Sequence, residues 1–225
     1  ETRLDLAAKN VAIARDVTAN VMKYYNGGAI MVISNPVDVI TYLVQKESGL
    51  PAGRVFGTGT VLDSARFRYF LSTRLDADIR NKHGLPPGEH GESHFAVWSS
   101  VHVSGMRLDS FCAKRGIALD KDEVLKDTVS SGAQVIKRKG VTNYAIAAIA
   151  AELAGTVIKN KRSIFSVTSV LHDYYGINDV AVSVPSFVGD EGVVGNLVYD
   201  FTDEERGKLC NSAKQLRSFL DSLKI

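Results

Sequence analysis

The sequence is poor in features that mark specialised classes of protein. Its 225 residues include two cysteines, Cys112 and Cys210, which lie far apart and lack the close spacing of a metal site. A reduced, cytoplasmic compartment is therefore the default expectation, and no metal site is predicted. The charged and polar N-terminal stretch does not have the pattern of a secretory signal.

Long apolar runs and a strong charge imbalance are also missing. No run reaches the ~18 residues that a membrane-spanning helix requires. The formal net charge is +2, and no basic stretch alternates with aromatic residues, so a nucleic-acid binder is not expected. With 45% apolar and 23% charged residues, the chain has the composition of a soluble globular protein that can bury a sizeable core.

A complete dinucleotide-binding loop is absent as well. Gly57-Thr58-Gly59 begins such a motif, but position 62, where G-x-G-x-x-G needs its third glycine, is a leucine. This signal is weak on its own.

The first third of the sequence has the alternation of an α/β protein. Apolar spacing predicts helices over 4–25, 37–48 and 61–75, separated by buried strands over 29–34 and 54–57. The order strand, helix, strand predicts a parallel βαβ unit. Two strands are too few for a stable open sheet, so we expect an upstream segment to cover the apolar edge of strand 29–34.

Beyond residue 76 the pattern changes. Short antiparallel strands are expected within 77–84 and 95–105, and further strands at 164–167, 180–185 and 195–199. Helices are predicted at 120–139, at 143–159, and at 203–223 behind a capping box of Thr202 and Glu205. The residues of 143–159 expected to face inward are Ala145, Ile146, Ala148, Ile149, Leu153 and Val157. The predicted fold class is α/β: the end of a doubly wound Rossmann-type parallel sheet (1–76), followed by an α+β substrate and catalytic domain (77–225).

Several residues are suited to acid–base chemistry on a small anion. His90 lies between glycines in Gly88-Glu89-His90-Gly91 and can change charge near neutral pH. Asp63 and Arg66 share a face of the predicted helix 61–75, and Arg68 points elsewhere. Asn35 follows strand 29–34 directly, and ligands of α/β sheets bind at such carboxyl ends.

Each of these residues also has a plainer interpretation. A loop histidine is usually just solvated, and a surface Asp–Arg pair contributes under about 1 kcal/mol. An asparagine before a proline commonly forms a turn. The residues alone leave both interpretations open.

Five motifs, in this order and spacing, resemble the L-lactate/malate dehydrogenase family, above all its bacterial lactate-specific members. The resemblance runs from residue 1 to the C-terminus and implies an NAD-dependent oxidoreductase that interconverts pyruvate and L-lactate, cytoplasmic and homotetrameric. The motifs are Glu1-Thr2-Arg3-Leu4, Ser34-Asn35-Pro36-Val37-Asp38, Leu62-Asp63-Ser64-Ala65-Arg66-Phe67-Arg68, Gly88-Glu89-His90-Gly91-Glu92-Ser93 and Val141-Thr142-Asn143-Tyr144-Ala145-Ile146.

The resemblance also implies catalytic roles. His90 matches the proton donor and acceptor, and Asp63 matches the carboxylate that holds its imidazole. Arg66 matches the guanidinium that binds the substrate carboxylate. Arg3 matches a mobile-loop arginine that polarises the substrate carbonyl.

Further positions match binding residues of the family. Asn35 corresponds to an amide near substrate and nicotinamide, Thr58 to a residue beside the carboxamide, and Thr142 to a wall of the substrate pocket. Arg68 and His83 match a subunit-interface site for fructose 1,6-bisphosphate. Relatives that are not activated carry the same pair, so activation stays open.

Two departures from the family pattern keep alternatives open. The glycine-rich loop and the first strands are absent, so the chain resembles the C-terminal two-thirds of the enzyme. We expect an upstream segment of ~90–100 residues, about half a domain, and no full activity without it. Because substrate choice rests on Thr142 alone, a malate or branched 2-hydroxy-acid dehydrogenase is an alternative, as is a non-catalytic fragment that lacks the nucleotide-binding half.

Overall fold

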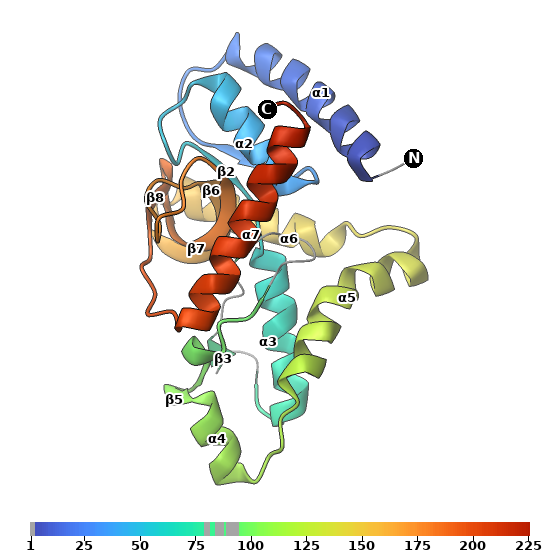
Figure 1. Ribbon diagram of the computed structural model, residues 1–225, viewed down its shortest axis with the longest axis vertical. Coiled ribbons are helices and arrows are strands. Elements are labelled where there is room, and N and C mark those ends of the chain that lie inside the picture. The colour runs from blue at the N-terminus through green and yellow to red at the C-terminus, as the bar shows by residue number, and fades with distance from the viewer. Residues whose placement is uncertain (1–2, 79–81, 84–87, 89–94) are drawn as a thin grey trace.

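A computed structural model describes residues 3–78, 82–83, 88 and 95–225, without the side chains of 3–6 and 82–83. The protein is a mixed α/β structure (Figure 1). Its first part follows the predicted order closely. The elements there are α1 (Arg3–Met22), β1 (Ile30–Val32), α2 (Val37–Ser48), β2 (Val55–Gly57) and α3 (Val61–Leu75).

One five-stranded sheet, in the order β1-β2-β6-β7-β8, runs through the described part of the molecule. β1 and β2 are parallel, with Ile30 opposite Val55, as the predicted βαβ unit requires. β2 then pairs antiparallel with β6 (Ser163–Val170) at Gly57 and Thr168. The sheet continues through β7 (Ala181–Gly189) and β8 (Gly192–Asn196), so the parallel and antiparallel strands form one surface.

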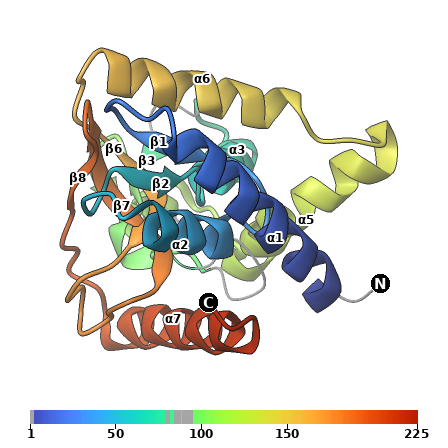
Figure 2. The ribbon, with the colours of Figure 1, turned by 90° about the horizontal axis from the view of Figure 1, so that it is seen from above.

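Helices cover both faces of this sheet. α6 (Tyr144–Ile158) and α7 (Asp203–Ser222) lie on opposite sides of it (Figure 2). On the α7 side, apolar residues of α2, β7 and α7 form the largest core cluster, which includes Leu43, Val182 and Leu216. On the other side, Leu153 of α6 packs with Phe56 and Val167 of the sheet.

The contact between α2 and β2 depends on a glycine. A Cβ added at Gly57 would lie 2.4 Å from Thr41 Oγ1 and 2.8 Å from Val37 Cγ2, too close for any real side chain. α2 ends at Gly49, whose left-handed backbone (φ 63°) suits the residue after a helix. Gly57 thus lets α2 pack closely on β2, and Gly49 marks where α2 ends.

A smaller part of the molecule lies around α3. A three-stranded antiparallel sheet contains β3 (Lys82–His83), β4 (His102–Val103) and β5 (Met106–Arg107). α4 (Leu108–Arg115) follows, and α5 (Lys121–Lys139) packs against α3 with Asp120 as its N-cap. Their apolar side chains form a separate core around Phe67, Leu71 and Val101.

The structure corrects several predictions. The strand expected at 195–199 is β8 at 192–196. Of the described residues within 77–84, Lys82 and His83 form β3, and within 95–105 the strand is β4, after a 3-10 turn at Trp98–Ser100. Ala145 and Ala148 are exposed, because α6 buries only Ile149, Leu153 and Thr156. α4 was not predicted.

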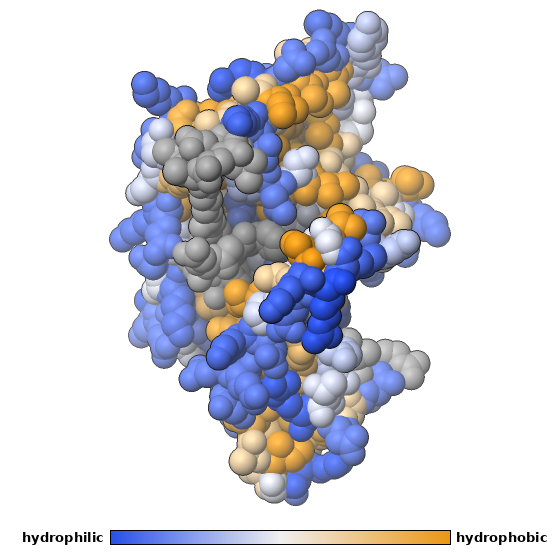
Figure 3. All heavy atoms as spheres, turned by 90° about the vertical axis from the view of Figure 1, so that its right-hand side faces the viewer, coloured by the Kyte–Doolittle hydropathy of each residue, from blue (hydrophilic) through white to orange (hydrophobic). Residues whose placement is uncertain are grey.

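An apolar groove of about 580 Å³ lies between α1 and the outer edge of β1. It is lined by Ile13, Val17 and Val21 of α1, each at least 45% exposed, and by β1 up to Asn35. Apolar side chains gather at the upper end of this face, at the level of α1 (Figure 3). In the described residues β1 pairs on one side only, which agrees with the predicted open edge.

The helices of the described ranges include none with the length and apolar character needed to cross a bilayer.

Candidate functional site

The carboxyl ends of β1 and β2 form the edge at which Asn35 and Thr58 lie. The backbone N–H of Thr58 donates to the carbonyl of Val32 at 2.9 Å, which holds the ends of the two strands together. Thr58 is buried, and Asn35 is exposed with its carbonyl oxygen accepting a hydrogen bond from Asn10 of α1 at 2.8 Å. An exposed amide at this edge is placed to meet a ligand.

α3 begins just beyond this edge and carries the predicted Asp–Arg pair. Arg66 Nη1 donates to Asp63 Oδ1 at 3.1 Å, which confirms that the two residues share one helix face. The pair is not a surface pair, because the side chains are only 15% and 8% exposed. Removing two charges from water is costly unless they gain strong partners, so a buried pair at a strand edge suggests a functional role.

α5 approaches the Arg66 guanidinium at Gly132. A Cβ at Gly132 would lie 3.5 Å from both terminal nitrogens of Arg66, so the guanidinium occupies the space between α3 and α5. Sequence reasoning missed this residue. A glycine inside a helix costs about 1 kcal/mol relative to alanine, so its presence in the predicted helix 120–139 was the signal that could have pointed to a close contact there.

The predicted effector residues are only partly described. Arg68 is partly exposed and its Nε donates to the carbonyl of Ser64 at 3.3 Å, so it does not join the Asp63–Arg66 pair. His83 lies in β3 opposite His102, and its side chain is outside the described residues.

The remaining predicted residues are His90, Arg3 and Thr142. His90 is outside the described residues, but Gly88, two residues earlier, donates its N–H to the carbonyl of Ser183 in β7 at 2.9 Å. Arg3 is the first residue of α1, and its side chain is likewise not described. Thr142 is partly buried in the link between α5 and α6.

No group of three His, Cys, Asp or Glu side chains gathers as a metal ion would require, as far as the described ranges extend. The buried charged pair near the start of α3 is instead a carboxylate and a guanidinium. Such a pair suits a small anionic ligand, because arginine binds a carboxylate with two parallel hydrogen bonds.

Fold and site together define a class: mixed α/β proteins with a parallel strand pair followed by a helix that carries a buried Asp–Arg pair. Sequence profiles then give the family. The NAD binding domain of lactate/malate dehydrogenases matches residues 1–57, and the alpha/beta C-terminal domain of the same enzymes matches residues 60–224. The chain belongs to the lactate/malate dehydrogenase family, in agreement with the resemblance in the five motifs.

Individual relatives support this membership along the whole chain. An L-lactate dehydrogenase of Thermoanaerobacter pseudethanolicus is 40% identical over 100% of this chain and 73% of its own length. Among solved structures, an L-lactate dehydrogenase from Clostridium thermocellum has 48% identity and a TM-score of 0.92, over 100% of this chain and 75% of the other. A minor L-lactate dehydrogenase from Enterococcus mundtii in a ligands-bound form has 35% identity and a TM-score of 0.94, over 99% and 71%.

Proposed function

We propose that the protein is an NAD-dependent L-lactate dehydrogenase that interconverts pyruvate and L-lactate. The observation that carries the proposal is the buried Asp63–Arg66 pair at the start of α3, in a chain that matches L-lactate dehydrogenases from end to end. A buried guanidinium can bind the planar carboxylate of a 2-oxo acid through two hydrogen bonds. A lysine ammonium group cannot form this pair of parallel hydrogen bonds.

The roles of the acid–base residues follow from the reaction. Reduction of pyruvate requires a hydride at carbon and a proton at oxygen, and NADH supplies the hydride when bound. Protonated His90 gives the proton, and Asp63 favours that protonated form. Arg3 stabilises the negative charge that develops on the carbonyl oxygen, so it acts mainly on the transition state.

The cofactor assignment rests on the strand edge. The described residues fit the nicotinamide end of NAD, because the exposed amide of Asn35 and the buried Thr58 lie at the same carboxyl edge. Thr142, in the partly buried link after α5, is assigned to the wall of the substrate pocket. We assign no residue of the chain to the pyrophosphate.

The finer properties of the enzyme are also proposals. We infer a cytoplasmic homotetramer, with fructose 1,6-bisphosphate bound by Arg68 and His83. Sedimentation velocity tests the assembly. Activity with and without the bisphosphate tests the effector site, and Arg68→Gln should abolish any activation.

Steady-state kinetics with NADH test the proposed reaction. We expect kcat/KM for pyruvate to exceed that for oxaloacetate or a branched 2-oxo acid at least tenfold, with L-lactate as the product. A preference for oxaloacetate or the branched acid would assign the protein to the malate or branched 2-hydroxy-acid enzymes. NADH binding without turnover of any of the three acids would indicate a non-catalytic protein.

A further inference from the structure

Three buried polar side chains form a hydrogen-bonded chain across the sheet. Thr168 Oγ1 of β6 donates to Asp38 Oδ1 of α2 at 2.5 Å and lies 2.7 Å from Ser183 Oγ of β7. Asp38 is 3% exposed, and the exposure of the other two side chains is 0%. We call these three residues the Asp38 chain.

The direction of the hydrogen bonds is fixed by the number of protons. Thr168 has one hydroxyl proton, and that proton goes to Asp38. Ser183 must therefore donate to Thr168. The result is a one-way chain, Ser183 to Thr168 to Asp38, in which each bond polarises the next.

Each member of the chain is attached to a segment that carries a proposed site residue. Asp38 is in the first turn of α2, three residues after Asn35. Thr168 pairs through its backbone with Gly57, the residue before Thr58.

The third member holds the segment that leads to His90. The carbonyl of Ser183 accepts the N–H of Gly88 at 2.9 Å, and Gly88 is two residues before His90 in the sequence. Gly59 also lies against the chain, because a Cβ there would be 2.5 Å from Ser183 Oγ and 2.7 Å from the Thr168 nitrogen.

Stability alone does not explain this arrangement. The Asp38 chain is buried beside the apolar core that includes Val182 and Val184. Burying a carboxylate and two hydroxyls costs free energy even when they are paired, and well-packed apolar residues commonly do as well or better.

We propose that Asp38, Thr168 and Ser183 are positioning residues that set the places of Asn35, Thr58 and Gly88 relative to one another. The inference rests on the proposed function for its effect on turnover. Its expected effect on the Gly88 amide does not depend on the proposed function. The Asp38 chain joins three segments that lie far apart in the sequence.

Thr168→Val in the purified enzyme tests the proposal, because valine keeps the shape and removes the hydroxyl. We expect kcat for pyruvate reduction to fall about 10²-fold, as displacements near 1 Å in a site commonly cause. The midpoint of the pH profile of kcat/KM should also shift. Thr168→Ser restores the hydroxyl and should recover both values to within about threefold of the unaltered enzyme.

Thr156→Val is the matched control, since Thr156 is 1% exposed and lies on α6. A second measurement is independent of catalysis: the hydrogen exchange rate of the Gly88 amide should rise at least tenfold in Thr168→Val and stay unchanged in Thr156→Val. Ser183→Ala, with Ser186→Ala as its control on β7, should show the same pattern if the valine variant does not fold.

The results separate the inference from the proposed function. An unaltered protein that does not reduce pyruvate would contradict the function, and the Gly88 exchange rate would still decide the inference. Normal Gly88 exchange in both Thr168→Val and Ser183→Ala would overturn it. So would losses of kcat that only follow stability and appear equally in Thr156→Val.

Discussion

At the scale of the residue, the proposed site depends on the fixed, planar geometry of the Arg66 guanidinium, which a lysine ammonium group lacks. Arg66 uses Nη1 for Asp63, and its far end lies where α5 has only a glycine, Gly132. The planar group is thus held at a fixed orientation on a rigid helix. A lysine ammonium group on its flexible side chain would neutralise Asp63 but would not orient a carboxylate.

Arg66→Lys should raise KM for pyruvate by roughly 10- to 100-fold, because one hydrogen bond to a charged group contributes about 1.5–3 kcal/mol. NADH binding, followed by fluorescence titration, should stay nearly unchanged. Arg74→Lys is the control, since Arg74 lies in the last turn of α3 and pairs with Asp127. Weakened NADH binding with an unchanged KM for pyruvate would reassign Arg66 to the nucleotide side.

The Asp63–Arg66 pair could be predicted because helix spacing alone determines it. The burial of the pair could not, since it depends on α5, which is far away in the sequence. The same applies to Asp38. Its motif stands out in the sequence, but its partners Thr168 and Ser183 come from strands that only the fold brings together.

At the scale of the element, local signals predicted helix ends well and strand ends less well. α3 and α5 match the predicted ranges 61–75 and 120–139, and Asp120 caps the start of α5. β7 continues through Pro185 to Gly189, and β8 pairs with it from Gly192 after a tight turn. That register is fixed by cross-strand pairing and by an irregularity at Phe187 and Val188, neither of which is a local property.

α4 was missed for a related reason. It is an eight-residue helix that buries only Leu108 and Cys112, so its apolar periodicity is short. Tertiary contacts with the core around Phe67 and Val101 stabilise it.

The start of α7 shows how a local motif becomes a tertiary one. Glu205 completes the predicted capping box by accepting from the Thr202 N–H at 3.0 Å. It also accepts from the N–H and hydroxyl of Ser99, at 3.1 and 2.7 Å. Burial by itself would raise the pKa of the Glu205 carboxyl, but the hydrogen bonds from Ser99 and Thr202 outweigh burial and lower the pKa.

Glu205→Gln should lower the free energy of unfolding by about 1.5–3 kcal/mol at pH 7, where the carboxylate is charged and hydrogen-bonded. A carboxyl group with a lowered folded pKa stabilises above its unfolded pKa, and this stabilisation is lost as pH falls through the folded pKa. The difference between the two proteins in urea unfolding should therefore shrink below about pH 4.5. Asp203→Asn, at an exposed position of the same turn, should show little effect. An equal difference at pH 7 and at pH 4 would refute the charged capping interaction.

At the scale of the whole molecule, the two predicted parts of the chain share one sheet. β2 of the first part and β6 of the second pair at Gly57 and Thr168, next to Thr58 of the proposed site. A pairing so distant in the sequence leaves no local signal, so the shared sheet could not be predicted from the sequence. α7 covers the side of the sheet opposite α6 (Figure 2).

Hydrogen bonds from Arg217 connect α7 to other parts of the molecule. Its guanidinium donates to the Tyr42 hydroxyl of α2 at 2.8 Å and to the Asp179 carbonyl before β7 at 3.0 Å. It also donates to the Ile225 carbonyl at 2.8 Å. One side chain thus joins a helix, a strand connection and the last residue of the sequence.

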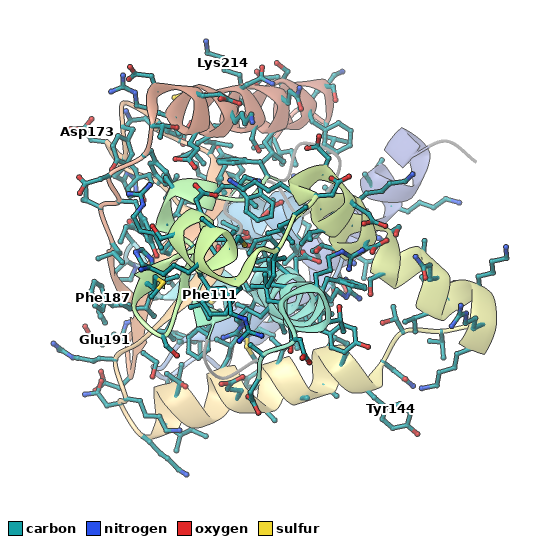
Figure 4. All side chains as sticks on the ribbon, turned by 90° about the horizontal axis from the view of Figure 1, so that it is seen from below. Phe111, Tyr144, Asp173, Phe187, Glu191 and Lys214 are labelled. Carbon is teal, nitrogen blue, oxygen red and sulfur yellow. The ribbon has the colours of Figure 1, made fainter. Side chains whose placement is uncertain are left out.

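Arg217→Ala should destabilise the protein by about 1–3 kcal/mol in urea unfolding, because it leaves several polar partners without their donor. KM for pyruvate should not change, since none of the contacts described for Arg217 is with a proposed site residue. Lys214→Ala is the control: Lys214 lies one turn away on α7 and extends into solvent (Figure 4). A large change in KM without a change in stability would show that α7 contributes to the site.

The central claim is that His90 transfers the proton in a site built around Asp63 and Arg66. His90→Asn tests it most directly, because asparagine keeps a polar side chain and cannot act as an acid near neutral pH. The account predicts a fall of about 10²–10⁴-fold in kcat for pyruvate reduction, with NADH binding unchanged. A fall of less than tenfold in a folded variant would contradict it.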